Sequence, residues 1–378
     1  MITDFDDYLI HQSATPISQP SVTDRNFYDR YWFNGYSNAG DLYLGVGFGR
    51  YPHRFVQDGH LSVVVDGVQH SFHCSGRAPD DPRDSSVGPM RIEVVDPMRV
   101  CRVLVEPNDT GIDCDLTFYA NTAPHQEPKN VMYDGTRLIM DTLRFTQFGR
   151  WEGYVSIQGR RIEVTRDAMY GTRDKSWGVR PVGEFEEGAP SKLSTSPGVY
   201  FVWMPLQFDG FCTHYFTREE PDGYPTELSA ARIKSYASMN EIPRGSADAG
   251  STELLRNARH SVRWAQGTRW PKAATLDFEA RDGVHHVELE PLLRFHMMGI
   301  GYQHHEWKHA LWHDELAIGA ESWRLEEVEP DDFATIHCQT VCRATMGEQL
   351  GIGVIESLCY GPHEPSGFED FFDGYSGD

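Results

Sequence analysis

The chain alternates short runs of apolar, often β-branched residues with polar turn residues. Where two runs flank an Asp-Gly pair, a two-residue hairpin turn is favoured, because both turn residues tolerate positive φ angles. The predicted strand pairs are Leu61–Val65 with Val68–Phe72, Ile92–Val95 with Val100–Val105, Tyr154–Ile157 with Arg161–Val164, and Leu276–Ala280 with Val284–Leu289; a further strand is predicted at Ile352–Ile355. Helical periodicity is rare, and the stretch around Glu253–His260 fits it best. Strands at this regular spacing predict an all-β fold of sandwiches or barrels.

A polar stretch rich in glycine, proline and serine divides the chain nearly in half, between Pro181 and Pro197. Both halves show the same hairpin chemistry, and 378 residues are enough for two domains, each with its own core. We therefore predict two tandem antiparallel β-barrels, residues 1–190 and 191–378, and duplication would explain their similarity. The acidic, aromatic tail at residues 368–378 is expected to pack on the surface or to be partly mobile.

The net charge limits the kinds of binding partner that can be expected, and the hydropathy of the chain bears on its cellular location. Lysine and arginine number 34 against 56 aspartates and glutamates, which gives a formal charge of −22. Such a surface repels phosphate backbones and anionic membranes, so we expect no nucleic-acid partner. No run of eighteen apolar residues could span a bilayer, and the N-terminus lacks a basic region followed by an apolar stretch. These features predict a soluble, cytoplasmic protein without a transmembrane segment.

Cysteines and aromatic residues add two expectations. The seven cysteines are scattered and form no C-x-x-C pair, so we expect small buried apolar residues in a reducing compartment. Aromatic residues make up 12% of the chain, including nine tryptophans. They fill β-barrel cores and also line pockets for large apolar ligands. Composition alone favours the core interpretation.

The segment from Tyr170 to Arg180 concentrates reactive groups just before the predicted boundary. It holds two arginines, an aspartate, a lysine and a tryptophan between two glycines. Glycine lets the backbone turn sharply, so several polar side chains could converge on one cavity. The alternative is a strand end with a surface Arg173–Asp174 ion pair, which would stabilise the fold little.

The second candidate segment is His305–His309, which matches the H-E-x-x-H pattern of zinc hydrolases. On a helix the two histidines would share a face and hold zinc, with the glutamate activating water. Glycines bracket the segment, its apolar positions follow no clear period, and a third ligand at Glu326 or Glu327 has no support. We therefore predict no metal site.

The third candidate segment, residues 351–368, reads as a strand followed by a turn-rich loop. Its Gly351-x-Gly353 lacks the third glycine and the following helix of a dinucleotide fingerprint. The chain also has no phosphate-binding loop of the Walker type and no G-x-S-x-G nucleophile elbow. His363 lies between prolines and is more typical of a loop residue than of a catalyst. No cofactor is predicted.

These segments together resemble the tandem lipocalin-like superfamily that includes carotenoid 1,2-hydratases (hydroxyneurosporene synthases) and AttH-type proteins. Gly171-Thr-Arg-Asp-Lys-Ser-Trp-Gly-Val-Arg180 looks like the family's R-D-H-x-W-G-x-R block at the end of the first barrel. Glu306-Trp-Lys-His309, Gly353-Val-Ile-Glu356 and Gly361-Pro-His-Glu-Pro-Ser-Gly367 look like second-barrel blocks of a related subgroup. The family's histidine after the aspartate is Lys175 here. The resemblance implies two lipocalin-like barrels and a hydrophobic ligand.

The resemblance, together with the chemistry of alkene hydration, implies roles for these residues. Hydration needs an acid with a raised pKa, aromatic faces for the cation and a placed water. We assign Asp174 as the acid, Trp177 as a wall of the cation site, and Glu306 or His309 as the base that directs water. The remaining candidates are Lys175 as a catalytic residue, Arg173 and Arg180 as binders of a carboxylate or polar end of the substrate, and Tyr170, Tyr302, His305 and Trp307 as substrate contacts. The structural alternatives are that Asp174 pairs with Arg173 or Arg180 and that Trp177 plugs the seam between the domains.

The leading functional hypothesis is a cofactor-independent hydratase or dehydratase, a carbon–oxygen lyase, that acts by acid–base catalysis on an apolar isoprenoid-like or phenylpropanoid-like molecule. The first alternative is an isomerase or cyclase that uses the same pocket. The second is a carrier of lipophilic ligands without catalysis, the usual role of single lipocalin barrels. The sequence leaves a homodimer open, because strand edges can pair between chains.

Overall fold

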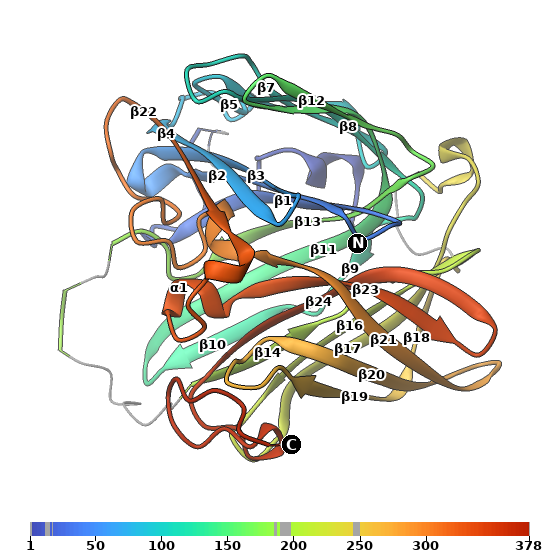
Figure 1. Ribbon diagram of the computed structural model, residues 1–378. Helices are drawn as coiled ribbons and strands as arrows, with labels where there is room; N and C mark the ends of the chain where they lie inside the picture. The colour runs from blue at the N-terminus through green and yellow to red at the C-terminus, as the bar shows by residue number, and fades with distance from the viewer. Residues whose placement is uncertain are drawn as a thin grey trace.

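The computed structural model describes residues 2–11, 16, 18–184, 187–189, 198–244 and 250–377, and strands dominate it (Figure 1). The described strands form two antiparallel sheets, so the predicted all-β class is confirmed. The helices are short: α1 (Phe333–Ile336) and 3-10 turns at Asp4–Asp7, Pro52–Arg54, Met239–Glu241, Met297–Ile300, Leu325–Glu327 and Glu364–Ser366. No helix among the described residues is both long enough and apolar enough to cross a membrane.

The first sheet curls into a nearly closed barrel. Its strands are β1 (Phe27–Ser37), β2 (Leu42–Tyr51), β3 (Val56–Val65), β4 (Val68–Arg77), β5 (Ser86–Val87), β6 (Met90–Asp96), β7 (Val100–Val105), β8 (Ile112–Ala120), β9 (His125–Gln126), β10 (Asn130–Asp134), β11 (Arg137–Ile157), β12 (Arg160–Val164), β13 (Met169–Val179) and β22 (Leu316–Arg324). They follow the order β22-β4-β3-β2-β1-β13-β11-β8-β7-β6-β5. The end strand β5 returns against β3 and β4, which brings the two ends of the path together.

The second sheet comes from the C-terminal half. Its strands are β14 (Val199–Trp203), β15 (Leu206–Gln207), β16 (Phe211–Glu219), β17 (Pro225–Lys234), β18 (Thr252–Leu254), β19 (Arg256–Trp264), β20 (Pro271–Ala280), β21 (Gly283–His296), β23 (Cys338–Met346) and β24 (Gln349–Tyr360). The order is β18-β17-β16-β14-β24-β23-β21-β20-β19. In Figure 1 the first sheet lies above the second, and β11 and β13 face β23 and β24.

The hairpins follow the turn chemistry of the sequence. Asp66 and Gly67 take φ angles of 51° and 74° and join Val65 to its partner Val68. Gln158 and Gly159 do the same between β11 and β12, with φ angles of 51° and 79°. The predicted turn at Asp282-Gly283 is displaced by one residue, because Gly283 already pairs with Ala280.

The helix predicted around Glu253–His260 is wrong, because this segment forms β18 and β19. Along β19, exposure alternates so that Ala258 and Trp264 are buried between exposed arginines. The pairing of β19 with β20 supplies the backbone hydrogen bonds of the segment, and tertiary pairing outweighs the weak local helical pattern.

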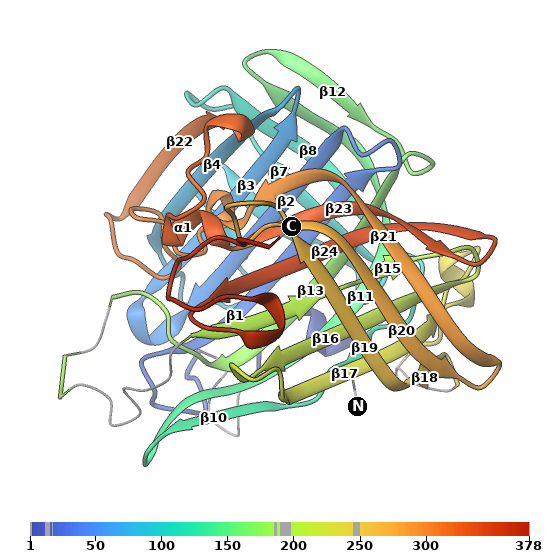
Figure 2. The ribbon, with the colours of Figure 1, turned by 60° about the horizontal axis from the view of Figure 1, so that its bottom comes forward.

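One strand of the second half completes the first sheet. In β22, residues from Leu316 to Arg324 pair with β4 from Gly76 to Val68, and Figure 2 shows β22 beside β4. Much of the predicted boundary at 181–197 lies outside the described residues, and the second sheet begins at Val199. The division at residue 190 stays a prediction, with β22 as a segment that crosses it.

Buried side chains form three main apolar clusters. One fills the first barrel, a second fills the C-terminal sheet, and a third joins the two sheets face to face. The third cluster includes Trp32 and Tyr43 from the first sheet and Trp203, Phe216 and Phe295 from the second. We call the space between the facing sheets the seam.

Glycines of β2 make the seam possible. Gly45 and Gly47 face it, and a Cβ at these positions would collide with the ring of Phe295 and with the guanidinium of Arg30, respectively. The absence of side chains here lets groups from β1 and from the second sheet lie across β2.

The structure also shows the environment of the cysteines and of the C-terminal tail. All seven cysteines are free and buried, as expected. The tail packs onto the second sheet, because the buried Arg269 binds the Asp373 carboxylate at 2.5 Å and the Asp370 carbonyl at 2.8 Å.

Candidate active site between the two sheets

The polar side chains of residues 170–180 were predicted to converge on one cavity, but strand β13 directs them to opposite faces of the sheet. Successive side chains of a strand point to opposite faces. Arg173, Lys175 and Trp177 therefore face the interior of the first barrel, whereas Asp174 and Ser176 face the seam. A single cavity formed by all of these residues is not what the structure shows.

Arg173 is fully engaged inside the first barrel. Its Nη1 lies 2.6 Å from Asp7 Oδ1, and its Nε and Nη2 donate to Gln147 Oε1 at 2.9 and 2.7 Å. Asp7 comes from the N-terminal 3-10 turn, and both members of the ion pair are buried. The pair leaves Arg173 committed to Asp7, so it neither binds Asp174 nor remains open for a substrate carboxylate.

Lys175 and Trp177 are likewise engaged on the barrel side of β13, Lys175 by Asp29 of β1 and Trp177 by His11 of the N-terminal segment. Lys175 Nζ donates to Asp29 Oδ1 at 2.5 Å, and its side chain is inaccessible to solvent. The indole of Trp177 stacks on the imidazole of His11 with 3.5 Å between ring centroids. Neither side chain reaches the seam, so Lys175 and Trp177 lie on the opposite face of β13 from Asp174.

Asp174 is the ionisable group at the centre of the seam. It lies opposite Trp32 of β1 and Thr146 of β11. Burial raises the pKa of Asp174 to about 7, although the Arg144 guanidinium, 4.0 Å away, opposes this shift. The negative charges of Glu127 and Glu356 raise this pKa further. A carboxyl with such a pKa still holds its proton near neutrality, as a general acid must.

The seam is not completely filled at this point. Asp174 and Arg144 lie deep among protein atoms, yet 15% and 28% of their side-chain surfaces remain accessible to solvent. Ser176, two residues further along the same face of β13, is also partly accessible. These side chains therefore line a space between the sheets that water can enter.

Glu127, a second carboxylate beside Asp174, is stabilised in its ionised form. Glu127 accepts hydrogen bonds from Arg144 Nη2 and Thr146 Oγ1, both at 2.5 Å, and lies 3.3 Å from His214 Nε2. Burial would raise its pKa, but the charge of Arg144 and these bonds hold the pKa of Glu127 below its usual value. Two neighbouring carboxyl groups are thus divided into one that keeps its proton and one that stays ionised, an arrangement typical of acid–base sites.

Two tryptophans form an aromatic wall next to Asp174. Trp32 of β1 and Trp203 of β14 meet edge to face, with 5.6 Å between centroids. Both indoles are buried, and neither Nε1–H has a hydrogen-bond partner among the described residues. Trp32 and Trp203 pack in the seam, whereas Trp177, the tryptophan singled out from the sequence, packs on the other face of β13. Their faces can stabilise a cation and their N–H groups can donate to a ligand.

A buried histidine–glutamate pair comes from the second sheet. His337 Nε2 lies 2.7 Å from Glu356 Oε1, and Glu356 stands opposite Trp203 in the pairing of β14 and β24. Gln339 Nε2 donates to Glu356 Oε2 at 2.5 Å, which holds the carboxylate in place. Because the carboxylate accepts the Nε2–H, His337 Nδ1 presents its lone pair. This nitrogen has no partner among the described residues, so its lone pair can accept a proton.

Tyr302 and His309 reach the same region from the loop after β21, which is the region predicted to carry a base. Tyr302 accepts a hydrogen bond from Arg30 Nη1 at 2.9 Å, and its ring lies 4.6 Å from the His309 ring and 4.9 Å from the His337 ring. Burial and the charge of Arg30 lower the pKa of His309 well below its usual value. Its Nε2–H donates to the Ile300 carbonyl at 2.7 Å, so His309 serves as a neutral structural group.

The rest of the H-E-x-x-H segment does not form a site. Residues 301–310 are loop and not helix, because glycines and polar turns interrupt the segment. His305 is 73% exposed and lies 3.2 Å from Asp332, whereas His309 is buried, so the two histidines do not share a face. Glu306 is exposed, and the Trp307 ring stacks 5.4 Å from His73. Glu306, His305 and Trp307 therefore lie outside the group around Asp174.

Among the described residues, His73, His304 and Glu321 come close enough together to suggest a metal site, with donor atoms within 4.8 Å of one another. However, His304 Nδ1 accepts the backbone N–H groups of Glu306 and Trp307 at 3.0 and 2.8 Å. A neutral imidazole then carries its hydrogen on Nε2, which donates to Glu321 at 2.6 Å. A metal ligand needs a lone pair on that nitrogen and a hydrogen on the other. The donor set therefore does not fit a metal ion.

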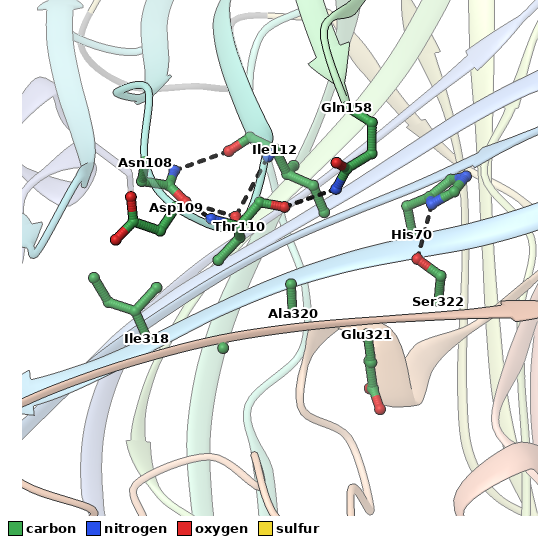
Figure 3. A pocket seen from close by; sticks show the side chains of 11 residues that line it. His70, Asn108, Asp109, Thr110, Ile112, Gln158, Ile318, Ala320, Glu321 and Ser322 are labelled. Carbon is green, nitrogen blue, oxygen red and sulfur yellow. Dashed lines mark hydrogen bonds between the residues drawn. The ribbon is translucent and has the colours of Figure 1, made fainter.

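Two hollows open on the molecular surface away from Asp174. The first, of about 870 Å³, lies between β22 and the turn at Asn108–Ile112, and Figure 3 shows Glu321 pointing away from it. The second, of about 830 Å³, opens beside Tyr170 and Gln207. Tyr170 lies on the same face of β13 as Asp174 and stacks under Arg150 at 3.4 Å. The second hollow thus marks the Tyr170 end of the seam.

Several seam residues were missed by the sequence analysis. Trp32, Arg30, Arg144, Glu127 and His337 come from segments that carry no motif. The strand Phe27–Ser37 gives no clear signal, because polar and aromatic residues occur on both of its faces. Of the predicted site residues, Asp174, Tyr302 and Tyr170 face the seam, and Arg180 lies at its end near Tyr302.

The chain is similar to known proteins along most of its length. Residues 2–369 match the model of a family of unknown function, DUF8625, whereas no curated protein matches. A Nitrosomonas europaea protein provisionally named AttH shares 13% identity and a TM-score of 0.55, with 88% of this chain and 92% of that chain covered. Kievitone hydratase from Nectria haematococca shares 13% identity and a TM-score of 0.51, with 87% of this chain and 88% of that chain covered.

At these identities the solved structures show a common fold and nothing about the reaction. The AttH match agrees with the AttH part of the resemblance noted in the sequence. The family model covers nearly the whole chain. The chain therefore belongs to the DUF8625 family of unknown function.

Proposed function

We propose that the protein is a cofactor-independent hydratase or dehydratase that acts on a C=C bond of an apolar molecule bound in the seam. The observation that carries the proposal is Asp174. Its pKa of about 7, its position opposite Trp32 and its accessible surface suit an acid that protonates carbon.

Different residues of the seam can carry out the successive steps of hydration. Asp174 transfers its proton to one alkene carbon, the π electrons form the new C–H bond, and the other carbon becomes a cation. Trp32 and Trp203 present indole faces to that cation. Water then attacks the cation and forms the C–O bond. His337, oriented by Glu356, accepts the proton that the water loses. Loss of this proton from His337 to solvent and uptake of one by Asp174 restore both groups, so the net change is addition of one water.

This assignment changes the predicted roles in one respect. Water activation was predicted for Glu306 or His309, but Glu306 is exposed and His309 Nε2 is hydrogen-bonded to a carbonyl. His337 has an unpartnered nitrogen in the right region and a carboxylate that orients it. We therefore propose His337 as the base. Dehydration would use the same groups in reverse.

The proposal is tested by offering panels of isoprenoids, phenylpropanoids and polyenes in ¹⁸O-water and analysing the products by mass spectrometry. We expect a product that carries one labelled oxygen and one added water. An isomer without label would replace the proposal by an isomerase or cyclase reaction in the same pocket. Binding without turnover of any compound would contradict catalysis and favour a carrier of lipophilic ligands.

A further inference from the structure

Two arginines at the end of the seam carry charges that the protein does not pair. Arg30 of β1 is 1% exposed; its Nη1 donates to Tyr302 Oη at 2.9 Å and its Nη2 to the Ile300 carbonyl at 3.2 Å. Arg180 follows β13, and its guanidinium lies 4.5 Å from the ring centroid of Tyr28 and 5.8 Å from that of Tyr302. The Nε–H groups of both arginines have no partner among the described residues.

Neither guanidinium forms an ion pair with a carboxylate of the residues that the structure describes. Among the other deeply placed arginines, Arg144 pairs with Glu127, Arg173 with Asp7 and Arg269 with Asp373, whereas Arg50 and Arg99 donate to the backbone carbonyls of Asp80 and Ile242. Buried charges are costly unless they are paired, so two guanidinium groups that share Tyr302 as a neighbour and have no carboxylate partner are unusual.

Asp58 is a nearby carboxylate that could pair with the two guanidinium groups, but its oxygens already accept hydrogen bonds from other groups. Its Oδ1 accepts from Tyr51 Oη at 3.2 Å and its Oδ2 from the Ala310 backbone N–H at 2.7 Å. It influences both arginines only through space, beyond ion-pair distance. The site therefore keeps an excess of positive charge and of free N–H donors.

The position of these arginines connects them to Asp174. Arg30 pairs across the sheet with Ser176, which is small, partly accessible and faces the seam. Ser176 is two residues from Asp174, or about 7 Å along the strand. Arg180 is also partly accessible despite its deep location. A group bound to Arg30 beside Ser176 would thus lie a few carbon atoms from the carboxyl of Asp174.

We infer that Arg30 and Arg180 form a carboxylate-binding subsite, and that the ligand of the seam is an apolar molecule with a carboxylate at one end. Its placement relative to the reacting bond rests on the proposed function, but binding of the carboxylate does not. Planar guanidinium groups with free N–H donors suit the two oxygens of a carboxylate. The apolar part of the ligand would extend from this subsite past Asp174 toward Trp32 and Trp203.

The inference is tested by measuring binding of paired probes: geranate against geraniol, and trans-cinnamate against cinnamyl alcohol. Isothermal titration calorimetry at pH 8 gives the affinities without any need for turnover. We expect each carboxylate to bind about 10- to 100-fold more tightly than its alcohol, as charge-assisted hydrogen bonds provide. Equal affinity of acid and alcohol for the wild-type protein, or no binding of either, would overturn the inference.

Single-residue variants test whether Arg180 causes the preference for the carboxylate probe over the alcohol. Arg180→Gln should remove the preference for the acid while leaving the alcohol's affinity within about twofold, and Arg180→Lys should retain part of it. Arg77→Gln is the matched control, because Arg77 is an exposed arginine of the same barrel. Thermal unfolding identifies variants that fail to fold. Retention of the full preference in folded Arg180→Gln would contradict the assignment. A preserved preference without any labelled product in ¹⁸O-water would reject the proposed hydratase and keep the subsite.

Discussion

Asp174→Asn should lower the rate of product formation by about 10²- to 10⁴-fold, the usual contribution of a general acid. The amide has nearly the same shape and volume as the protonated carboxyl, but it cannot release a proton to carbon. Binding of the ligand should change little, because Asp174 makes no hydrogen bond to the arginines that we assign to the carboxylate. The measurement is the initial rate of ¹⁸O incorporation with a substrate found in the panel, together with ligand affinity by calorimetry.

The matched control for this substitution is Asp167→Asn, which changes an exposed aspartate in the turn before β13. It should leave the rate unchanged. A folded Asp174→Asn protein with wild-type turnover would show that the proton comes from another group. A joint loss of turnover and affinity would indicate that Asp174 binds the ligand instead of protonating it.

The second large effect concerns stability. Asp7→Asn should destabilise the fold by about 3–5 kcal/mol, the cost of removing one partner of a buried ion pair. Asp7 neutralises the buried Arg173 and accepts the Met98 backbone N–H at 2.6 Å. The amide would leave the guanidinium without a counter-charge inside the barrel. Equilibrium unfolding in urea, followed by tryptophan fluorescence, measures the change in the free energy of unfolding.

Glu315→Gln provides the comparison, because it breaks the exposed Arg77–Glu315 pair, whose side chains are 53% and 65% accessible. Such a surface pair is screened by water, and its loss should have little effect. An Asp7→Asn protein as stable as the wild type would contradict the role that we assign to the N-terminal segment in closing the first barrel.

The fold class was predictable because local turn chemistry marks the hairpins. Asp66-Gly67 defined a register that the structure confirms. The prediction of a helix around Glu253–His260 failed because a short charged segment has no strong preference of its own and follows its partner β20.

The faces of the central strands were much harder to assign. β1 and β2 are buried on both sides, so their sequences show no alternation of polar and apolar residues. For the same reason, nothing local indicates that Asp174 faces the seam while Arg173 and Lys175 face the barrel. Asp174 was singled out as a candidate acid without any indication of the face that it takes, and its proposed neighbours were taken from the same short segment.

The other members of the site come from distant strands. Trp32, Arg144, Trp203 and Glu356 lie on four different strands and meet only when the two sheets pack together. No spacing within one segment could reveal them. The H-E-x-x-H match shows the opposite problem: the residues are adjacent in sequence, but the loop directs His305 to solvent and His309 to the interior.

The central claim is that a seam carboxyl holds its proton near neutral pH, and infrared difference titration tests it without a known substrate. Subtracting the Asp174→Asn spectrum from that of the wild type isolates the C=O band of protonated Asp174. The subtraction also removes Asp58, whose pKa burial raises to about 6. We predict a band that is present at pH 5 and lost with a midpoint near pH 7, because burial raises the pKa of Asp174 to about 7. A band lost near pH 4, as for an exposed aspartate, would contradict the account.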